Sequence, residues 1–461
     1  MNFAIIITGF SKHGIRMLKC FMNTTKFIRS HFMNVKFEEL LDILKEEVKP
    51  ALGCTGPTVF SYVAAEARDA VGGTPKKIII KADKDKCAKE DDVGIPGTQY
   101  RGVKIAAALG AFGGDHKAKL EVLNSVTPED EKRAYDFSLS DNIIVEPDWS
   151  TNVVGVYIDI TVETENGIGR AVVVQKHTNL VYKEANGKAI VNKSFDRLAS
   201  INETADPITN YLISDLYEFV TQIPVEELYF LRESVEMNSE LAQAALNDKT
   251  GIGLASSMMK RENGNFLGRA KAMTAAGSEA RMAGYNLPAM ACATSGNVGI
   301  TASLPLISMA EDLGKTEEDL LRALALSFLM TVMCKNLIGR QSAMCACMVG
   351  ASQGIAAGAV LLFGGGVKEI EMSINNTIVN VFGVVCDGAR MACAVKLSSA
   401  IGMAIEGAMP AMDGVAVPAD EGVCGKTADD SLKFMGNFAR NGMGETDMML
   451  CKSLYAKHHG E

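Results

Sequence analysis

The pattern of apolar and polar positions divides the chain into a mixed first half and a nearly all-helical second half. Apolar residues at helical spacing over 37–49 predict an amphipathic helix, which Pro50 ends. After it come several runs rich in β-branched residues, which predict strands and a sheet. The clearest of these strand-like runs are 76–83, 142–147, 153–164 and 169–191. Within the last run, Asn186-Gly187 separates two apolar alternations and predicts a hairpin turn.

Beyond about residue 205 the pattern becomes that of packed helices. Ala, Gly, Met and Leu dominate, and Pro224 suits the first turn of a helix that continues through the following residues. Small side chains allow helices to approach closely. We therefore predict an α+β protein, with an N-terminal α+β domain over 33–205 that contains an antiparallel sheet. A mostly α-helical domain over 206–461 follows it.

The first 32 residues do not fit either domain. They contain an apolar start and several basic residues, but no basic stretch precedes the apolar segment and no cleavage site follows it. Met33 stands directly before the first helical pattern. We expect residues 1–32 to be a dispensable N-terminal extension.

Composition and charge exclude two classes of protein. The chain has 461 residues and a net charge of −9, which argues against nucleic-acid binding. We find no apolar run that approaches the length of a membrane span, and the longest ones, 324–333 and 354–367, are better interpreted as buried helices. We expect a soluble, cytoplasmic protein that binds neither nucleic acid nor membrane.

The cysteines carry the first chemical signal. There are eleven, eight of them in the second half, and a long chain without a signal peptide is not a disulfide framework. Cys386 and Cys393 flank an Asp-Gly turn, which suits a disulfide or a metal site better than a core. The C-x-x-C spacing of zinc sites is absent, whereas iron–sulfur clusters accept wider spacing. Cys345 and Cys347 could then supply a third sulfur, which would leave one iron open as a Lewis acid.

A separate thiol lies near the start of the chain, in ALGCTGP at 51–57. A helix is expected to begin near Thr58, and a cysteine close to a helix N-terminus has a lowered pKa. Cys54 is therefore a candidate reactive thiol. The alternative is a buried turn cysteine, and one spacing does not decide between them.

Two further segments contain polar residues at breaks in the pattern. TSGNVGI at 294–300 is similar to the Ser-Gly-Asn loop of pyridoxal-phosphate β-eliminases, but the parallel βαβ pattern of that fold is missing. The nearby Lys260 and Lys271 lie in an Ala-rich helical context, so we do not expect pyridoxal phosphate. The same loop can still bind a carboxylate through backbone N–H groups and Asn297. His177, in HTN, closes a strand and is a candidate for substrate binding.

Taken together, these segments resemble one family, the iron–sulfur L-cysteine desulfidases, which are relatives of the L-serine dehydratase α chain. The resemblance covers about Lys36 to Lys452, and the joint order of its motifs is far more specific than any one of them. The motifs are EEVKPALGCTGP (46–57), PGT (96–98), AAALGAFGG (106–114), HTN (177–179), SEARMAG (278–284), SGNVGITASLP (295–305), SAMC (342–345) and VCDGARMACAVK (385–396).

This resemblance implies a cofactor and an activity. Members of the family use an oxygen-sensitive [4Fe-4S] cluster to convert L-cysteine into pyruvate, ammonia and sulfide. The cluster-ligand positions fall on Cys345, Cys386 and Cys393, and the proton acceptor falls on Cys54. One position departs from the family, because Gly56 stands where related sequences carry a glutamate. That departure affects the tuning of the base and the choice of substrate.

The reaction implied is an α,β-elimination on a small-molecule amino acid. Five residues are candidates for holding its carboxylate and amine: Thr98, His177, Arg281, Ser295 and Asn297. Two other classes stay open at this point, an L-serine dehydratase in the same frame and a cluster-binding protein without turnover. A homo-oligomer is compatible with the sequence, which does not specify an oligomeric state.

Overall fold

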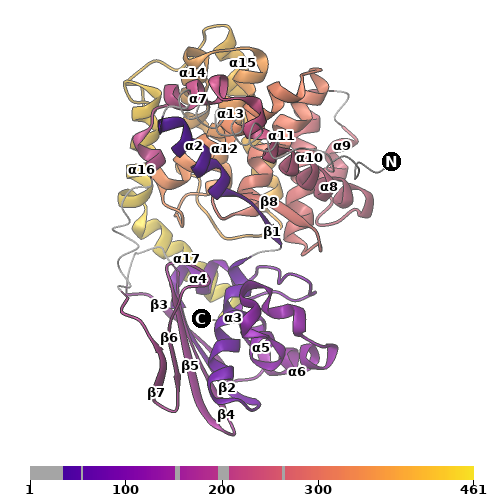
Figure 1. Ribbon diagram of the computed structural model, residues 1–461, viewed down its shortest axis with the longest axis vertical. Helices are drawn as coiled ribbons and strands as arrows, with labels where there is room; N and C mark the ends of the chain where they lie inside the picture. The colour runs from indigo at the N-terminus through magenta and orange to yellow at the C-terminus, as the bar shows by residue number, and fades with distance from the viewer. Residues whose placement is uncertain (1–34, 53–54, 151–155, 196–206, 262–264, 461) are drawn as a thin grey trace, which may run out of the picture.

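The computed structural model describes residues 35–52, 55–150, 156–195, 207–261 and 265–460. Within them the chain forms a sheet-containing body and a larger helical body, which lie one above the other in Figure 1. The predicted α+β class, with a sheet in the first half and helices in the second, is confirmed. The proposed boundary after residue 205 and the extension over 1–32 fall outside the described residues.

The sheet has six strands in the order β3-β2-β4-β5-β6-β7. Their bounds are β2 (Pro75–Asp83), β3 (Ile143–Asp148), β4 (Tyr157–Thr164), β5 (Gly167–Val174), β6 (Leu180–Ala185) and β7 (Lys188–Asn192). All neighbours pair antiparallel except β2 and β3, which are parallel because helices connect them. The predicted hairpin turn is confirmed, since Asn186 and Gly187 both have positive φ, of 50° and 77°.

One face of the sheet carries the core of this body. The strands direct Ile78, Ile80 and Ile158 inward, and all three are fully buried. The helices α3 (Thr55–Val71) and α5 (Val103–Gly113) pack against each other over this face, and α6 (Pro128–Ser138) packs on α5. Figure 1 shows these helices beside the strands in the lower part of the molecule.

The helical body is built from long, apolar helices in close contact. They are α7 (Ile213–Gln222), α8 (Arg232–Asp248), α9 (Leu254–Met259), α10 (Phe266–Met282), α11 (Gly296–Asp312), α12 (Glu317–Ile338), α13 (Ala346–Phe363), α14 (Val367–Val381), α15 (Cys393–Met412) and α16 (Ala428–Gly442). The expected role of small residues is visible where α13 crosses α12. A Cβ atom at Gly354 would lie 2.3 Å from the carbonyl oxygen of Ser327, so this approach requires glycine.

The two apolar segments noted in the sequence belong to α12 and α13. By length and composition alone, both helices could cross a membrane. This was not predicted from the sequence, because only the shorter apolar runs 324–333 and 354–367 were considered. However, 89% of the apolar window in α12 and 78% of that in α13 is buried inside the protein. This burial is typical of core helices and agrees with their interpretation as buried helices.

Both ends of the described chain pack on the body that is distant in sequence. Helix α2 (Val35–Glu47), indigo in Figure 1, lies on the helical body, where Phe37 meets Phe219 edge to face at 5.5 Å. Helix α17 (Gly444–His459), yellow, lies against the sheet-containing body. There the Tyr455 hydroxyl donates to the Val145 carbonyl at 2.9 Å. The two cores therefore do not follow the order of the chain.

Two local predictions differ from the structure. The first helix ends at Glu47 rather than at residue 49, because Val48–Leu52 forms strand β1 and pairs antiparallel with β8 (Pro288–Cys292). The helix expected after Pro224 starts as a 3-10 segment, Val225–Leu231, before α8 begins. Pro50 lies inside β1, which a two-stranded sheet tolerates because each strand has a free edge.

Candidate functional site

A short backbone bridge brings two of the predicted ligand cysteines together. Met344 and Val385 form an isolated antiparallel bridge. Beside it, the Cys345 N–H donates to the Val384 carbonyl and the Cys386 N–H donates to the Ala343 carbonyl, both at 2.8 Å. Residues 41 positions apart therefore lie side by side, and the thiols of Cys345 and Cys386 form a hydrogen bond with each other.

The third cysteine reaches the same place through the Asp-Gly turn. Gly388 has φ of 97°, and a Cβ atom there would lie 2.2 Å from the Lys89 carbonyl, so the turn requires glycine. Cys393 is the first residue of α15, and its Sγ accepts from the Arg390 N–H at 3.3 Å. It acts electrostatically on both other thiols. The structure thus brings Cys345, Cys386 and Cys393 into one group.

Cys345 and Cys393 are buried and Cys386 is partly buried, and cationic side chains lie around the three thiols. A hydrogen bond with Cys347 raises the pKa of Cys345, and the hydrogen bond with Cys345 raises the pKa of Cys386. Burial raises the pKa of Cys393 to about 11. Lys89 opposes the rise at Cys386, and Lys396 opposes it at Cys393. A metal centre must displace the thiol protons, and these ammonium groups would stabilise the resulting thiolates.

This donor set fits an iron–sulfur cluster. Three cysteine sulfurs converge from two segments, and their positive neighbours can offset the negative charge of a thiolate-bound cluster. Cys347, considered above as a source of the third sulfur, hydrogen-bonds to Cys345 and so belongs to the same group. Its neighbour Cys345, and not Cys347, faces Cys386 across the bridge.

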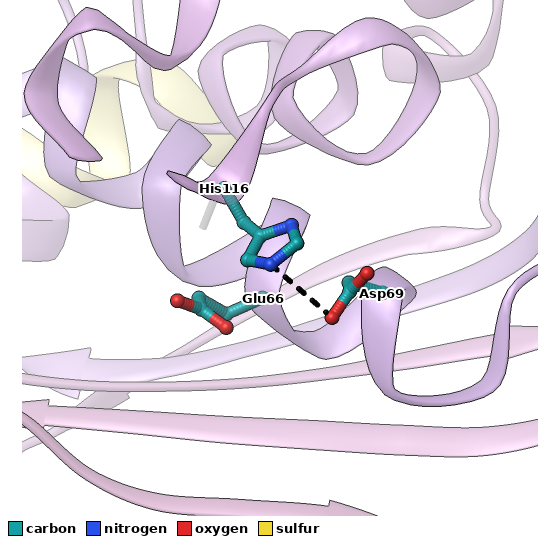
Figure 2. Close-up of side chains that lie close together, drawn as sticks. All are labelled: Glu66, Asp69 and His116. Carbon is teal, nitrogen blue, oxygen red and sulfur yellow. Dashed lines mark ion pairs between the residues drawn. The ribbon is translucent and has the colours of Figure 1, made fainter. Parts of the chain in front are cut away.

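Two other groups with metal-ligand chemistry occur among the described residues, and lysines already bind the carboxylates of both. Glu66, Asp69 and His116 lie together in Figure 2, with the His116 ring 3.4 Å from Asp69. Lys183 binds the carboxylates of Glu66 and Asp69, each at 2.6 Å. The second group, Asp85 with Asp447 and Cys451, is considered with its lysines below. An ion would have to displace these ammonium groups, so neither group is favoured as the metal centre.

The Ser-Gly-Asn loop begins α11 in a strained conformation. Ala293 and Thr294 have φ of 47° and 67°, a left-handed conformation that residues other than glycine rarely adopt. The buried Lys335 holds the loop by donating to the Ala293 carbonyl. Ser295 stands at the N-cap position of α11 without a capping hydrogen bond from its side chain. Asn297 is buried, and its Oδ1 has no hydrogen-bond partner among the described residues. Strain of this kind is typical of functional loops.

Arg281 and Thr98 lie close to this loop. The guanidinium of Arg281 fills the space beside Gly296, where a Cβ atom would lie 2.3 Å from its Cζ. Thr98 uses its hydroxyl in its own turn, donating to the Ile95 carbonyl at 3.0 Å. That turn approaches Gly284, just after α10. The structure therefore brings Arg281, Ser295 and Asn297 together, and Thr98 is near them with its hydroxyl already in use.

His177 reaches the site from the turn after β5. Burial, together with the charges of Lys86 and Lys335, lowers the pKa of His177 to about 3. The imidazole is therefore neutral at ordinary pH. Its Nε2 is buried and has no hydrogen-bond partner in the described part of the chain. Because Lys335 also holds the Ser-Gly-Asn loop, His177 and that loop share a neighbour.

Cys54, the predicted proton acceptor, lies outside the described residues. The chain on either side is described, and β1 ends at Leu52 while α3 begins at Thr55 rather than near Thr58 as expected. Because β1 pairs with β8, the segment that leads to Cys54 runs beside the strand that leads to the Ser-Gly-Asn loop. Its role stays a prediction.

The sequence interpretation missed one element, the short helix α4 (Lys84–Lys89). All six of its residues are buried although three are lysines, because Lys84 and Lys89 both bind Asp85 and Asp447. Glu90 follows the helix, and its carboxylate lies against Gly56. A run of alternating Lys and Asp normally indicates a solvent-exposed segment, so no local signal pointed to these residues.

The thiol group and the Ser-Gly-Asn loop are the candidate functional features of this fold. Comparison with known proteins identifies the family to which the chain belongs. Residues 117–452 match the family described as the serine dehydratase alpha chain. The chain belongs to this family. Its relatives include a UPF0597 protein of Clostridium tetani, 37% identical over 89% of this chain and 96% of the relative. Another, from Caldanaerobacter subterraneus, is 36% identical over 91% of this chain and 98% of the relative.

Proposed function

We propose that this protein is an iron–sulfur-dependent lyase of the serine dehydratase type that converts L-cysteine and water into pyruvate, ammonia and sulfide. The observation that carries the proposal is the group of three thiols together with the strained loop at the start of α11. Lys335 links the two, because it holds the Ala293 carbonyl of the loop and interacts electrostatically with Cys347 of the thiol group. Membership of the serine dehydratase alpha chain family supports the lyase class. The preference for cysteine rests on the motif resemblance. The burial of both long apolar helices supports a soluble protein, which we place in a reducing cytoplasm.

Cys345, Cys386 and Cys393 would hold a [4Fe-4S] cluster. When bound, such a cluster supplies a Lewis acid at the iron that lacks a cysteine ligand. Lys89 and Lys396 would stabilise the thiolates by their positive charge. Three thiolate ligands would leave one of the four irons without a protein ligand.

The remaining residues would bind the amino acid and move its proton. The N-terminus of α11, with Ser295 and Asn297, offers backbone N–H groups for the substrate carboxylate. Arg281 beside Gly296 adds a positive charge next to that position. The neutral His177 would hydrogen-bond to substrate without adding charge. Cys54 would take the α-proton, which breaks the C–H bond as sulfide leaves the β-carbon. Water then hydrolyses the released enamine to pyruvate and ammonia.

L-Serine dehydratase is the second candidate activity, because the matching family is described as the serine dehydratase alpha chain. The two reactions differ only in the leaving group, sulfide or water. Anaerobically purified protein should be assayed with L-cysteine and L-serine separately, measuring pyruvate for both and sulfide for cysteine. Faster pyruvate release from serine would favour the second candidate. Release from neither would leave a cluster-binding protein without turnover.

The metal centre has its own test, which does not depend on activity. We expect Cys386→Ala to lose iron, labile sulfide and broad visible absorption when it is prepared without oxygen. Cys424→Ala is the matched control, because Cys424 is also a buried free cysteine but lies in another part of the helical body. Stoichiometric zinc without labile sulfide in the wild-type protein would disprove the cluster.

A further inference from the structure

The carboxylate of Glu90 occupies the place that a side chain at position 56 would need. Gly56 lies in the first turn of α3. A Cβ atom built on it would lie 2.1 Å from Oε2 and 2.5 Å from Oε1 of Glu90. Any residue other than glycine at this position would displace the carboxylate.

One oxygen of this carboxylate is available for a ligand. Oε1 lies 3.4 Å from the ammonium of Lys86, whose side chain is 2% exposed. Oε2 is buried and has no hydrogen-bond partner among the residues that the structure describes. A buried acceptor that stays unpaired is costly, particularly on a charged group. Such an atom is best explained by a donor that arrives with a ligand.

The surroundings of Glu90 connect it to the candidate substrate site. Lys86, which contacts Glu90, also acts electrostatically on His177. His177 in turn experiences the charge of Lys335, which holds the Ser-Gly-Asn loop. Nε2 of His177 and Oδ1 of Asn297 are, like Oε2 of Glu90, buried without a partner in the described chain. Three unpaired polar atoms therefore occur around one set of buried lysines.

The other carboxylates described near the site are already paired. Glu47 binds Arg340 at 2.6 Å, and Asp92 binds Arg390 at 2.9 Å. Asp387 binds Lys396. Glu90 differs because its second oxygen is buried and unpaired. An amino-acid substrate carries both a carboxylate and an ammonium group. The cationic lysines and Arg281 can bind only the carboxylate, so the ammonium group needs an acceptor of its own.

We propose that Oε2 of Glu90 accepts a hydrogen bond from the α-ammonium group of the amino-acid substrate. Glu90 then selects α-amino acids over acids that carry the same leaving group but no amine. This inference rests on the proposed function, since it concerns the substrate of that same site. Glycine at position 56 is what admits the carboxylate.

The decisive variant is Glu90→Gln in the anaerobically prepared holoenzyme. The amide keeps the shape and removes the charge, so the fold should be retained. Because the hydrogen bond to the substrate ammonium loses its anionic acceptor, we expect KM for L-cysteine to rise about tenfold to a hundredfold. The inhibition constant of 3-mercaptopropanoate, which lacks the amine, should change by less than about threefold. Glu146→Gln, an exposed acid on β3, is the matched control and should change neither.

A second variant reaches the same atom from the other side. Gly56→Ala leaves Glu90 in the sequence but forces its carboxylate away, so it should reproduce the selective loss for the amino acid. Equal weakening of L-cysteine and 3-mercaptopropanoate in Glu90→Gln would indicate a structural role and overturn the proposal. Unchanged binding of both would do the same.

A binding measurement separates this inference from the proposed function. If the wild-type protein eliminates neither sulfide nor water, the proposed function fails. Calorimetric titration with L-serine and with 3-hydroxypropanoate still tests Glu90. We expect only the affinity for L-serine to fall in Glu90→Gln. Equal affinities of the wild-type protein for the two compounds would disprove the role of Glu90 as an ammonium acceptor.

Discussion

Cys54 is the residue on which the chemistry of the proposed reaction depends most. A thiolate can take a proton from the α-carbon, whereas a serine hydroxyl has a pKa several units higher. General-base catalysis contributes about a hundredfold to ten-thousandfold in rate. We expect Cys54→Ser to keep the cluster and to lower kcat by at least about a hundredfold. Loss of iron from this variant would instead make Cys54 a cluster ligand, and near-normal kcat would place the base elsewhere.

At the same scale, the lowered pKa of His177 predicts that the stability of the protein depends on pH. Its pKa is about 3 in the folded protein against an ordinary value of 6.5. Between these values the unfolded chain binds a proton that the folded protein does not, so His177 stabilises the fold above pH 6.5. This stability is lost progressively as the pH falls toward 3, by at most about 1.4 kcal/mol per pH unit.

The measurement compares wild type with His177→Gln by urea unfolding at pH 7, 6 and 5. We expect the free energy of unfolding of wild type to fall more steeply with decreasing pH than that of the variant. The steeper fall should be confined to the range below about pH 6.5. Parallel curves for the two proteins would show that His177 titrates normally in the folded state.

At the scale of elements, the turn between Cys386 and α15 connects the thiol group with helix α4. Gly388 allows this turn to touch the backbone of α4, and Arg390 extends the contact by binding Asp92 and the Ala88 carbonyl. The turn therefore fixes Cys386 close to Lys89 and Cys393 at the start of α15. A contact between elements, rather than the cysteines alone, therefore sets the shape of the thiol group proposed to hold the cluster.

Gly388→Ala tests this contact. The new Cβ would lie 2.2 Å from the Lys89 carbonyl, in a backbone conformation with φ of 97° that alanine disfavours. We expect lower iron content and a less stable protein, measured by iron analysis and thermal unfolding. Gly383→Ala is a control for conformation alone, because Gly383 also has positive φ of 79° but nothing lies within 4 Å of its Cβ position. Equal effects of both variants would show that the approach to Lys89 is unimportant.

At the scale of the whole molecule, a buried network of charges ties the last helix to the sheet-containing body. Asp447 on α17 binds Lys84 and Lys89 of α4, although more than 350 positions separate them. Although burial opposes the charge on Lys89, Asp85 and other negative groups raise its pKa, so the lysine stays charged. The same lysine acts electrostatically on Cys386, so the C-terminal helix is linked through Lys89 to the thiol group.

Asp447→Asn should therefore act far beyond its own helix. Removing one partner of a buried ion pair costs about 3–5 kcal/mol because the other charge stays buried. We expect a loss of this order in the free energy of unfolding, measured with urea, together with lower iron retention. Glu445→Gln, exposed in the first turn of the same helix, is the control. A loss below about 1 kcal/mol would show that the lysines find other partners.

Local sequence patterns were sufficient to predict most secondary-structure elements and to single out the cysteines that the structure brings together. Periodicity located the first helix, the strands and the packed helices, because these depend on neighbours within a few residues. The Asp-Gly turn between Cys386 and Cys393 was recognisable for the same reason, and the C-x-C at Cys345 pointed to a further sulfur. The resemblance added the joint order of motifs that no single spacing carries.

Which charged side chains are buried depends on contacts between segments that are distant in the sequence. From the sequence alone, the lysines of α4 would be expected on the surface, because lysine is rarely buried without a partner of opposite charge. Their partner Asp447 lies at the other end of the chain, and no local pattern links the two. The contact between Glu90 and Gly56 could not be predicted from local sequence either. Gly56 leaves space for a carboxylate, but only the folded chain shows that Glu90 fills it. Long-range contacts are fixed by packing and charge pairing of the whole molecule, which local sequence does not encode.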